Sequence, residues 1–175
     1  MSSSKPAGER AAASRTTRVL AALPRYLRTG VRSTRDVRSY LGRRGVSAGR
    51  AARLVAGYRA RGWLDDRAAA RLWADHWARE GYAASLIRAK LSAKGFSEDV
   101  IDETATRCCP PTDDQARARL LVATYLQRHA PPRRVRSLPA PAEGRQAGRL
   151  ARTLASRGFD SDLIEQVLNE SLGRE

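Results

Sequence analysis

The feature that most constrains the fold is a short helical pattern that occurs three times along the chain. In each copy, an apolar pair four residues apart is followed by a basic residue, a glycine and another apolar residue. The copies are Val37-x-x-x-Leu41-x-x-Arg44-Gly45-Val46, Ile87-x-x-x-Leu91-x-x-Lys94-Gly95-Phe96 and Leu150-x-x-x-Leu154-x-x-Arg157-Gly158-Phe159. Residues four apart share one face of a helix, and a glycine just beyond a helix end takes the left-handed conformation that terminates it. The pattern therefore predicts three helices with the same kind of C-terminus.

A capping residue follows each copy and predicts a further helix. These residues are Ser47, Ser97 and Asp160, and Ser and Asp are among the side chains preferred at helix N-termini. A longer helical segment precedes each copy, at residues 15–28, 65–80 and 112–129. No stretch shows the sustained alternation of apolar and polar residues that is typical of strands. We therefore expect an all-α fold, an elongated tandem array of three three-helix repeats.

The repeats have predicted boundaries and one irregular segment. We expect a disordered tail at residues 1–14, repeat 1 at 15–62, repeat 2 at 63–109 and repeat 3 at 112–172. The third repeat is longer because it contains a Pro/Arg-rich loop, residues 131–141. A long loop inside a compact repeat is often functional. It is also compatible with a tolerated insertion, and both interpretations stay open.

The charge is concentrated near the N-terminus. The net charge is +15, and residues 1–62 contain 15 Lys or Arg residues against Glu9 and Asp36. A concentrated basic field attracts polyanions, of which nucleic acid is the usual one. The competing explanation is solubility together with Arg-rich codon usage. A scaffold that contacts only other proteins would leave this charge unexplained.

The sequence contains no convincing catalytic or metal-binding constellation. His76 and His129 stand alone, and the pair Asp65-Asp66 is best explained as a helix N-cap. Cys108 and Cys109 are adjacent, a spacing that suits neither a disulfide framework nor a zinc site, so we expect a structural role rather than redox chemistry. We expect no enzyme activity, no cofactor and no bound metal. No apolar run approaches membrane-spanning length, which predicts a cytoplasmic protein without a membrane partner.

Four aromatic residues gather around the second repeat, and they have two interpretations. Trp73 and Trp77 are four apart on one helix, and Trp63 and Tyr82 flank that helix. Exposed rings of this kind stack on nucleic-acid bases. We favour the other interpretation, in which the four rings form a core or a junction between repeats.

The segment between the first two repeats resembles a known family motif. Gly62-Trp63-Leu64-Asp65-Asp66 is similar to the central Gly-Tyr-Leu-Asp-Asp motif of the RecX family. Residues 32–37 with Leu41 resemble that family's first-repeat pattern, and the resemblance extends over residues 15–172. The chain departs from the motif at Trp63, where the family has Tyr, and at Ala69, where it has Phe.

This resemblance implies a function. RecX proteins are non-enzymatic regulators that bind in the groove of the RecA–DNA filament and modulate, mostly by inhibition, its ATPase, strand-exchange and coprotease activities. The implied partners are the RecA filament and single-stranded DNA, with double-stranded DNA left open, and the implied form is a monomer that acts in DNA repair and the SOS response. We expect a collective basic contact surface made of Arg32, Arg35, Arg43, Arg44, Arg88, Lys90, Lys94, Arg133, Arg134, Arg136, Arg145, Arg149, Arg152 and Arg157.

The main alternative is a DNA-binding protein that acts without RecA. Residues 36–47 and the helix after them resemble a helix-turn-helix, with Arg50, Arg53 and Arg59 on the second helix. The same turn recurs in the second repeat, however, where the following helix begins with Glu98 and Asp99. Acidic helices enter a DNA groove poorly, so the recurrence favours a structural role for the turn.

Overall fold

The computed structural model describes residues 7–129 and 140–173. This part of the chain contains nine α-helices and one short 3-10 helix and no strand, which confirms the predicted all-α fold. The helices are α1 Ala7–Arg28, α2 Thr34–Arg43, α3 Ala48–Ala60, α4 Asp66–Arg79, α5 Ala84–Ala93, α6 Glu98–Cys108, α7 Asp114–Arg128, α8 Ala140–Ser156 and α9 Ser161–Leu172. The 3-10 turn η1, Pro111–Asp113, leads directly into α7.

Two predicted boundaries are wrong. The expected tail at residues 1–14 overlaps α1, which already begins at Ala7. Ala is the strongest helix former, so the Ala-rich segment 7–13 extends the helix in spite of its polar neighbours. Likewise α8 begins at Ala140, inside the expected loop 131–141. Residues 1–6 and 130–139 lie outside the described part.

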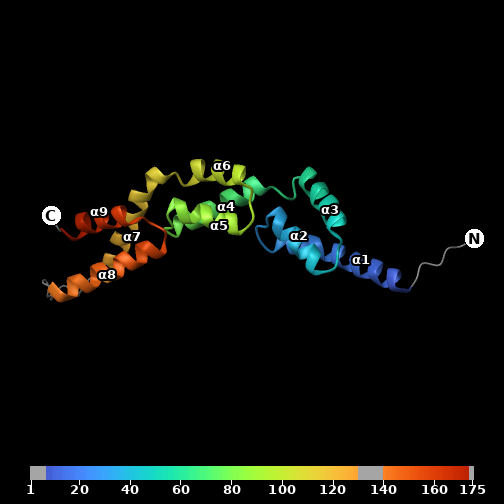
Figure 1. Ribbon diagram of the computed structural model, residues 1–175, viewed down its shortest axis with the longest axis horizontal. Helices are drawn as coiled ribbons and strands as arrows, with labels where there is room; N and C mark the ends of the chain where they lie inside the picture. The colour runs from blue at the N-terminus through green and yellow to red at the C-terminus, as the bar shows by residue number, and fades with distance from the viewer. Residues whose placement is uncertain (1–6, 130–139, 174–175) are drawn as a thin grey trace, which may run out of the picture.

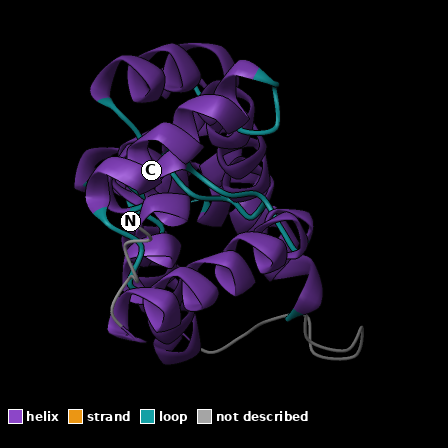
Figure 2. Ribbon diagram, turned by 90° about the vertical axis from the view of Figure 1, so that its right-hand side faces the viewer, coloured by secondary structure: helices purple, strands orange, loops and turns teal. Residues whose placement is uncertain are grey.

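The helices follow one another along an elongated body (Figure 1). Helices α1–α3, α4–α6 and α7–α9, here called the first, second and third triplets, occupy one end, the middle and the other end. The main helix–helix contacts lie within a triplet. Seen along the long axis, the described chain consists of helices joined by short connections (Figure 2).

Each triplet has an apolar cluster of its own. The first cluster is centred on Leu23, Val37, Leu41 and Val55. The second contains Ala69, Trp77, Ile87, Leu91 and Phe96. The third contains Val122, Leu150, Leu154, Phe159 and Val167. Such slim, separate cores bury little apolar surface each, so the contacts between neighbouring triplets contribute to the stability of the whole.

The repeated helix end forms as predicted. Gly45, Gly95 and Gly158 have φ of +79°, +80° and +85°. The backbone N–H of the following residue donates to the carbonyl five positions earlier, as from Phe96 to Leu91 (3.3 Å). This is the Schellman arrangement. The apolar residues that follow the glycines, Val46, Phe96 and Phe159, are all buried.

The predicted caps are confirmed only in part. The Asp160 carboxylate accepts hydrogen bonds from the N–H groups of Asp162 and Leu163 at 3.0 Å each. Ser47 and Ser97 do occupy N-cap positions, but their side chains make no capping hydrogen bond.

Candidate functional site

The first and second triplets are joined through the start of α2. The Thr34 N–H and hydroxyl donate to the two carboxylate oxygens of Asp66, at 2.8 and 2.7 Å. The Ser33 hydroxyl donates to the Lys94 carbonyl at 3.2 Å. The Arg35 side chain lies directly across Gly95, at a place where a Cβ would be 1.9 Å from its Cδ. The start of α2 therefore rests on both α4 and the α5–α6 turn.

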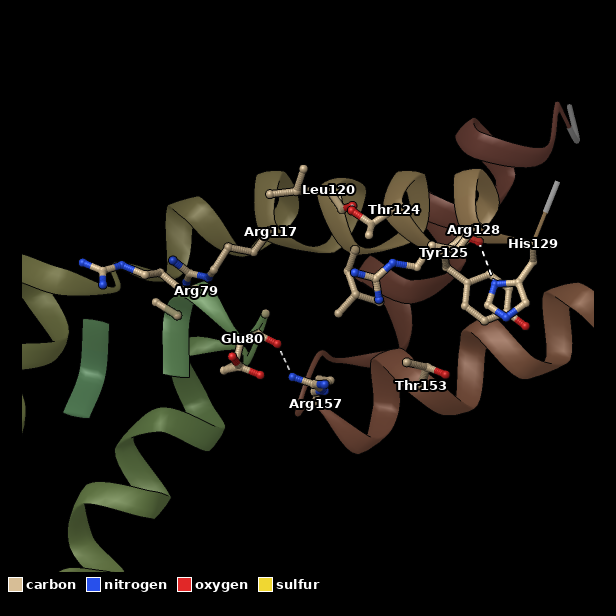
Figure 3. Close-up of a pocket in the computed structure, with 13 residues that line it drawn as sticks. Arg79, Glu80, Arg117, Leu120, Thr124, Tyr125, Arg128, His129, Thr153 and Arg157 are labelled. Atoms are coloured by element: carbon tan, nitrogen blue, oxygen red, sulfur yellow. Dashed lines mark hydrogen bonds between the residues drawn. The ribbon is translucent and has the colours of Figure 1, made fainter. Parts of the chain in front are cut away.

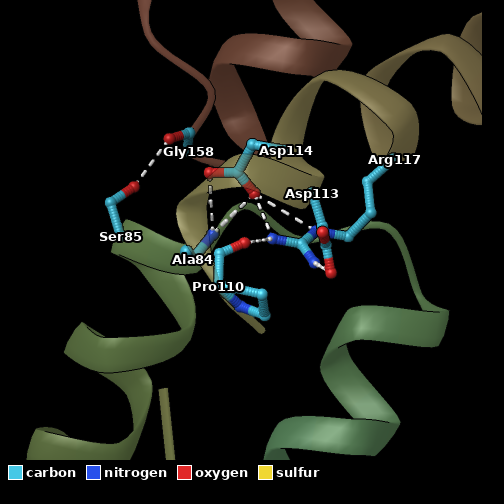
Figure 4. A network of polar contacts seen from close by, with 7 residues as sticks. All are labelled: Ala84, Ser85, Pro110, Asp113, Asp114, Arg117 and Gly158. Carbon is cyan, nitrogen blue, oxygen red and sulfur yellow. Dashed lines mark hydrogen bonds and ion pairs between the residues drawn. The ribbon is translucent and has the colours of Figure 1, made fainter. Parts of the chain in front are cut away.

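The second and third triplets are joined by the same arrangement. The Ala84 N–H donates to the Asp114 carboxylate, at 3.0 and 3.2 Å to its two oxygens (Figure 4). The Ser85 hydroxyl donates to the Gly158 carbonyl at 2.8 Å, and the Ala83 N–H donates to the Arg157 carbonyl at 2.9 Å. In both junctions, a carboxylate from the first helix of one triplet accepts the first N–H of the second helix of the preceding triplet.

This arrangement separates the roles of Asp65 and Asp66. Asp65 is the N-cap of α4, as predicted, and its carboxylate accepts from the N–H groups of Arg67 and Ala68 at 2.9 and 3.0 Å. We expected both Asp65 and Asp66 to cap α4. Asp66 does not cap its own helix, and its carboxylate instead accepts hydrogen bonds from Thr34 of the preceding triplet. Asp114 has the matching position in the third triplet, where the nearly buried Arg117 also pairs with it.

A hollow of about 450 Å³ opens beside the second junction (Figure 3). It lies between the end of α4, one face of α7 and the α8–α9 turn. Its lining includes Leu120, which is 68% exposed. It also includes a stacked pair, Tyr125 and His129, whose ring centroids are 4.1 Å apart. The lining also contains four arginines, Arg79, Arg117, Arg128 and Arg157.

A second hollow, of about 490 Å³, opens beside the first junction. It is lined by the α1–α2 loop and by Leu72, Trp73 and His76 of α4. Leu72 is 58% exposed. The Arg32 Nε and the Trp73 Nε1 are buried donors without a hydrogen-bond partner among the described residues. Neither hollow is predicted from the sequence, because the exposure of Leu72 and Leu120 depends on how neighbouring triplets meet.

Many of the predicted basic contact residues are held by other side chains. Arg32 lies over Tyr26, Arg44 over Tyr40 and Lys94 over Trp73, with the cation 4.5, 3.8 and 3.8 Å from the ring centroid. Lys90 and Arg157 come together over the Tyr82 ring, at 4.5 and 4.4 Å. Cation–π contacts fix these side chains in place while their charge stays near the surface.

The other predicted contact residues differ in their surroundings. Arg88 forms an ion pair with Asp102 of α6. The side chains of Arg43, Arg145, Arg149 and Arg152 are exposed and make no ion pair within residues 7–129 and 140–173. Arg133, Arg134 and Arg136 lie outside the described residues.

The aromatic cluster is only partly a core. Trp77 is buried, and Trp73 stacks on it with ring centroids 5.3 Å apart. Trp73 and Tyr82 pack against the second cluster, to which the buried Ala69 itself belongs. The core interpretation is wrong for Trp63, which is 59% exposed and lies beside Tyr58.

The cysteines are unpaired and weakly acidic. Burial raises the pKa of Cys109 to about 11. Burial, reinforced by the nearby Asp75 carboxylate, also raises the pKa of Cys108. Both thiols are therefore protonated at neutral pH, which suits a structural role. Within the described ranges, no three His, Cys, Asp or Glu side chains form a group able to hold a metal ion, and no helix is long and apolar enough to cross a membrane.

Comparison with known proteins identifies solved structures with a similar fold. No family model and no curated protein matches the chain. A crystal structure of RecX from Lactobacillus salivarius is similar with a TM-score of 0.66 and 14% identity, over 90% of this chain and 97% of that one. The chain has the RecX fold. A second crystal structure, of a regulatory protein RecX, is similar with a TM-score of 0.64 and 20% identity, over 95% of this chain and 80% of that one. The resemblance predicted from the motif around Asp65 and Asp66 is thus confirmed at the level of the RecX fold.

Proposed function

We propose that this protein is a RecX-type regulator that binds the RecA–DNA filament and restrains its ATPase, strand-exchange and coprotease activities. The observation that supports this most is the RecX fold over nine-tenths or more of the chain. The motif at residues 62–66 gives independent support from the sequence. The regulator acts by binding as a monomer, without a cofactor, in the cytoplasm where RecA meets DNA.

The shape and charge of the molecule are consistent with this proposal. Three separate apolar clusters follow one another along an elongated body, which leaves long faces open to a partner (Figure 1). We interpret the three triplets as tandem repeats. Such arrays present extended binding surfaces, and a filament groove is an extended partner.

The basic residues support an electrostatic contribution to binding. We propose that the fourteen predicted Arg and Lys residues act as one collective surface rather than as single essential contacts. Those over aromatic rings are pre-positioned, so less side-chain entropy is lost on binding. Those of α8, Arg145, Arg149 and Arg152, are exposed and share one face by helical spacing. Binding to a polyanion through such a surface weakens as salt is added.

A titration of RecA ATPase activity on single-stranded DNA tests the proposal. We expect ATP hydrolysis to slow at substoichiometric amounts of this protein in moderate salt. The matched control is the same titration with RecA and DNA but with heat-denatured protein. Unchanged hydrolysis at stoichiometric protein would contradict the proposed function.

A second candidate is a DNA-binding protein that acts without RecA. The observation in its favour is that α3 packs inward through Ala51 and Val55 and exposes Arg50, Arg53 and Arg59. Against it, the equivalent helix α6 is acidic, and its Asp102 and Glu103 already pair with Arg88 and Arg67. Tight, sequence-dependent binding to duplex DNA without RecA, abolished by Arg50→Glu with Arg53→Glu, would support this candidate over the first.

A further inference from the structure

The two junction hollows are equivalent sites. One hollow is lined by Leu72, Trp73 and His76 of α4, and the other by Leu120, Leu121 and Thr124 of α7. These residues correspond pairwise, because each pair is separated along the chain by the same number of residues as Asp66 and Asp114. The opposite wall comes in each case from the segment just before the capped helix, the α1–α2 loop or the end of α4. The same junction geometry therefore produces the same kind of hollow twice.

Each hollow combines an exposed apolar side chain with unused hydrogen-bond donors or charges. In the second hollow, Arg117 is held by Asp114 (Figure 4), and Arg157 is held by the Glu80 carbonyl (Figure 3). Arg79 and Arg128 have no ion-pair partner in the described part of the chain. In the first hollow, the Arg32 Nε and the Trp73 Nε1 lack an acceptor among the described residues. Buried donors without acceptors are costly, so turning the Arg32 side chain toward a ligand oxygen in the hollow is favourable.

We propose that the two junction hollows are docking sites for an acidic protein segment that also presents an apolar side chain. The partner is built of repeated subunits, and two successive subunits each place this same segment in one of the hollows. This rests on the proposed function, because the RecA filament is such a partner. The apolar side chain packs on Leu72 or Leu120. The carboxylate meets the arginines of the second hollow and Arg32 in the wall of the first.

The composition of the hollows favours a protein over DNA as the occupant. Leu72 and Leu120 are, with Trp63, the large apolar residues most exposed in the described structure. Exposed apolar side chains beside arginines are typical of protein interfaces, where a buried apolar anchor contributes most of the affinity. A site for phosphates alone requires the arginines but gains nothing from the leucines.

Binding of variants to preassembled RecA filaments tests this inference. The filaments are formed on a single-stranded oligonucleotide with a non-hydrolysable ATP analogue, and binding of the full-length protein is followed by fluorescence anisotropy. We expect Leu72→Ser and Leu120→Ser each to weaken filament binding about tenfold, and the double variant to lose roughly the product of the two. Since both leucines are exposed, the far-ultraviolet circular dichroism and Tm should stay close to those of the parent protein.

A matched pair of charge reversals tests the electrostatic part. Arg79→Glu with Arg128→Glu changes the hollow, whereas Arg50→Glu with Arg53→Glu makes the same change of charge on α3, outside both hollows. We expect a loss of about tenfold or more only for the first pair. Equal losses for the two pairs would overturn the inference, because the effect would then belong to overall charge.

The remaining outcomes separate this inference from the proposed function. If the parent protein does not bind the filament, the proposed function itself fails. If it binds and the leucine variants bind equally well, only the docking sites are overturned. Equal losses of binding to the oligonucleotide without RecA would identify nucleic acid as the occupant, which also overturns the inference.

Discussion

The Asp66 carboxylate accepts two hydrogen bonds from Thr34, one from the backbone N–H at 2.8 Å and one from the hydroxyl at 2.7 Å. These two residues belong to different triplets, and Thr34 is buried at their contact. The Asp66 carboxylate supplies an acceptor for one N–H of the first turn of α2, that of Thr34, beside the capping box that Ser33 and Asp36 form at the same helix end. The relationship explains why the second Asp of the motif matters to a neighbouring unit rather than to its own helix.

Replacing Asp66 should therefore loosen the junction. We expect Asp66→Ala to lower the free energy of unfolding by about 2 kcal/mol, because it leaves the buried Thr34 donors without an acceptor. Asp65→Ala, which removes only a local cap, should cost about 1 kcal/mol. Urea unfolding of both variants measures the difference. A double-mutant cycle with Thr34→Val should show a coupling of about 1 kcal/mol, and independent effects would contradict the assignment.

The three repeated glycines provide a graded test of packing between triplets. All three have similar positive φ, so alanine at any of them incurs about 1–2 kcal/mol of left-handed strain. A Cβ at Gly45 meets nothing within 4 Å, whereas one at Gly158 would be 2.5 Å from the Cβ of Leu86. That atom is fixed to the backbone, while the Arg35 chain across Gly95 can swing away. We expect the loss of stability on thermal unfolding to be greatest for Gly158→Ala, and equal losses would argue against the close contact.

The local features of this fold follow from the sequence, and the contacts between triplets do not. The left-handed glycines, the Asp65 and Asp160 caps and the apolar faces of α2 and α5 depend on residues a few positions apart. The partner of Asp66 depends instead on how α4 meets α2, which no local pattern specifies. The two hollows were missed for the same reason, since Leu72 and Leu120 look like ordinary core leucines until the neighbouring triplet is in place.

The type and position of Trp63 predict a core residue, but its ring is exposed, and this sets it apart from the buried Trp77. We expect Trp77→Ala to lower the free energy of unfolding by about 3–5 kcal/mol, because it removes a buried ring from the second cluster. Trp63→Ala should change it by about 1 kcal/mol or less, since the ring is largely in solvent and loses only its contact with Tyr58. Denaturant unfolding measures the free energy of unfolding of the two variants and of the parent protein. A large loss for Trp63→Ala would mean that its ring is buried in solution.

Cys109 should make stability fall at high pH. Its pKa is raised from 9.0 to about 11 in the folded protein, so the unfolded chain loses this proton first. The stabilising contribution is complete below about pH 9 and declines as the pH rises toward 11, by an amount on the order of 2 kcal/mol. Urea unfolding at pH 8 and pH 10.5 should show a smaller decline for Cys109→Ala than for the parent protein. If the free energy of unfolding declined equally in the parent protein and in Cys109→Ala, the pH dependence would belong to a group other than Cys109.

The Pro/Arg-rich segment should contribute to filament binding through its charge. Reversing Arg133, Arg134 and Arg136 to Glu is expected to weaken binding to the RecA filament and to reduce the slope of log K against log salt concentration, since fewer counterions are released. Helicity by circular dichroism should be unchanged. The matched control reverses Arg50, Arg53 and Arg59 on α3, an equal change of charge at exposed positions. If the loop variant loses helicity, the segment has a structural role. If both triple variants weaken binding equally, the filament senses the overall charge of the protein, and the loop has no special part in binding.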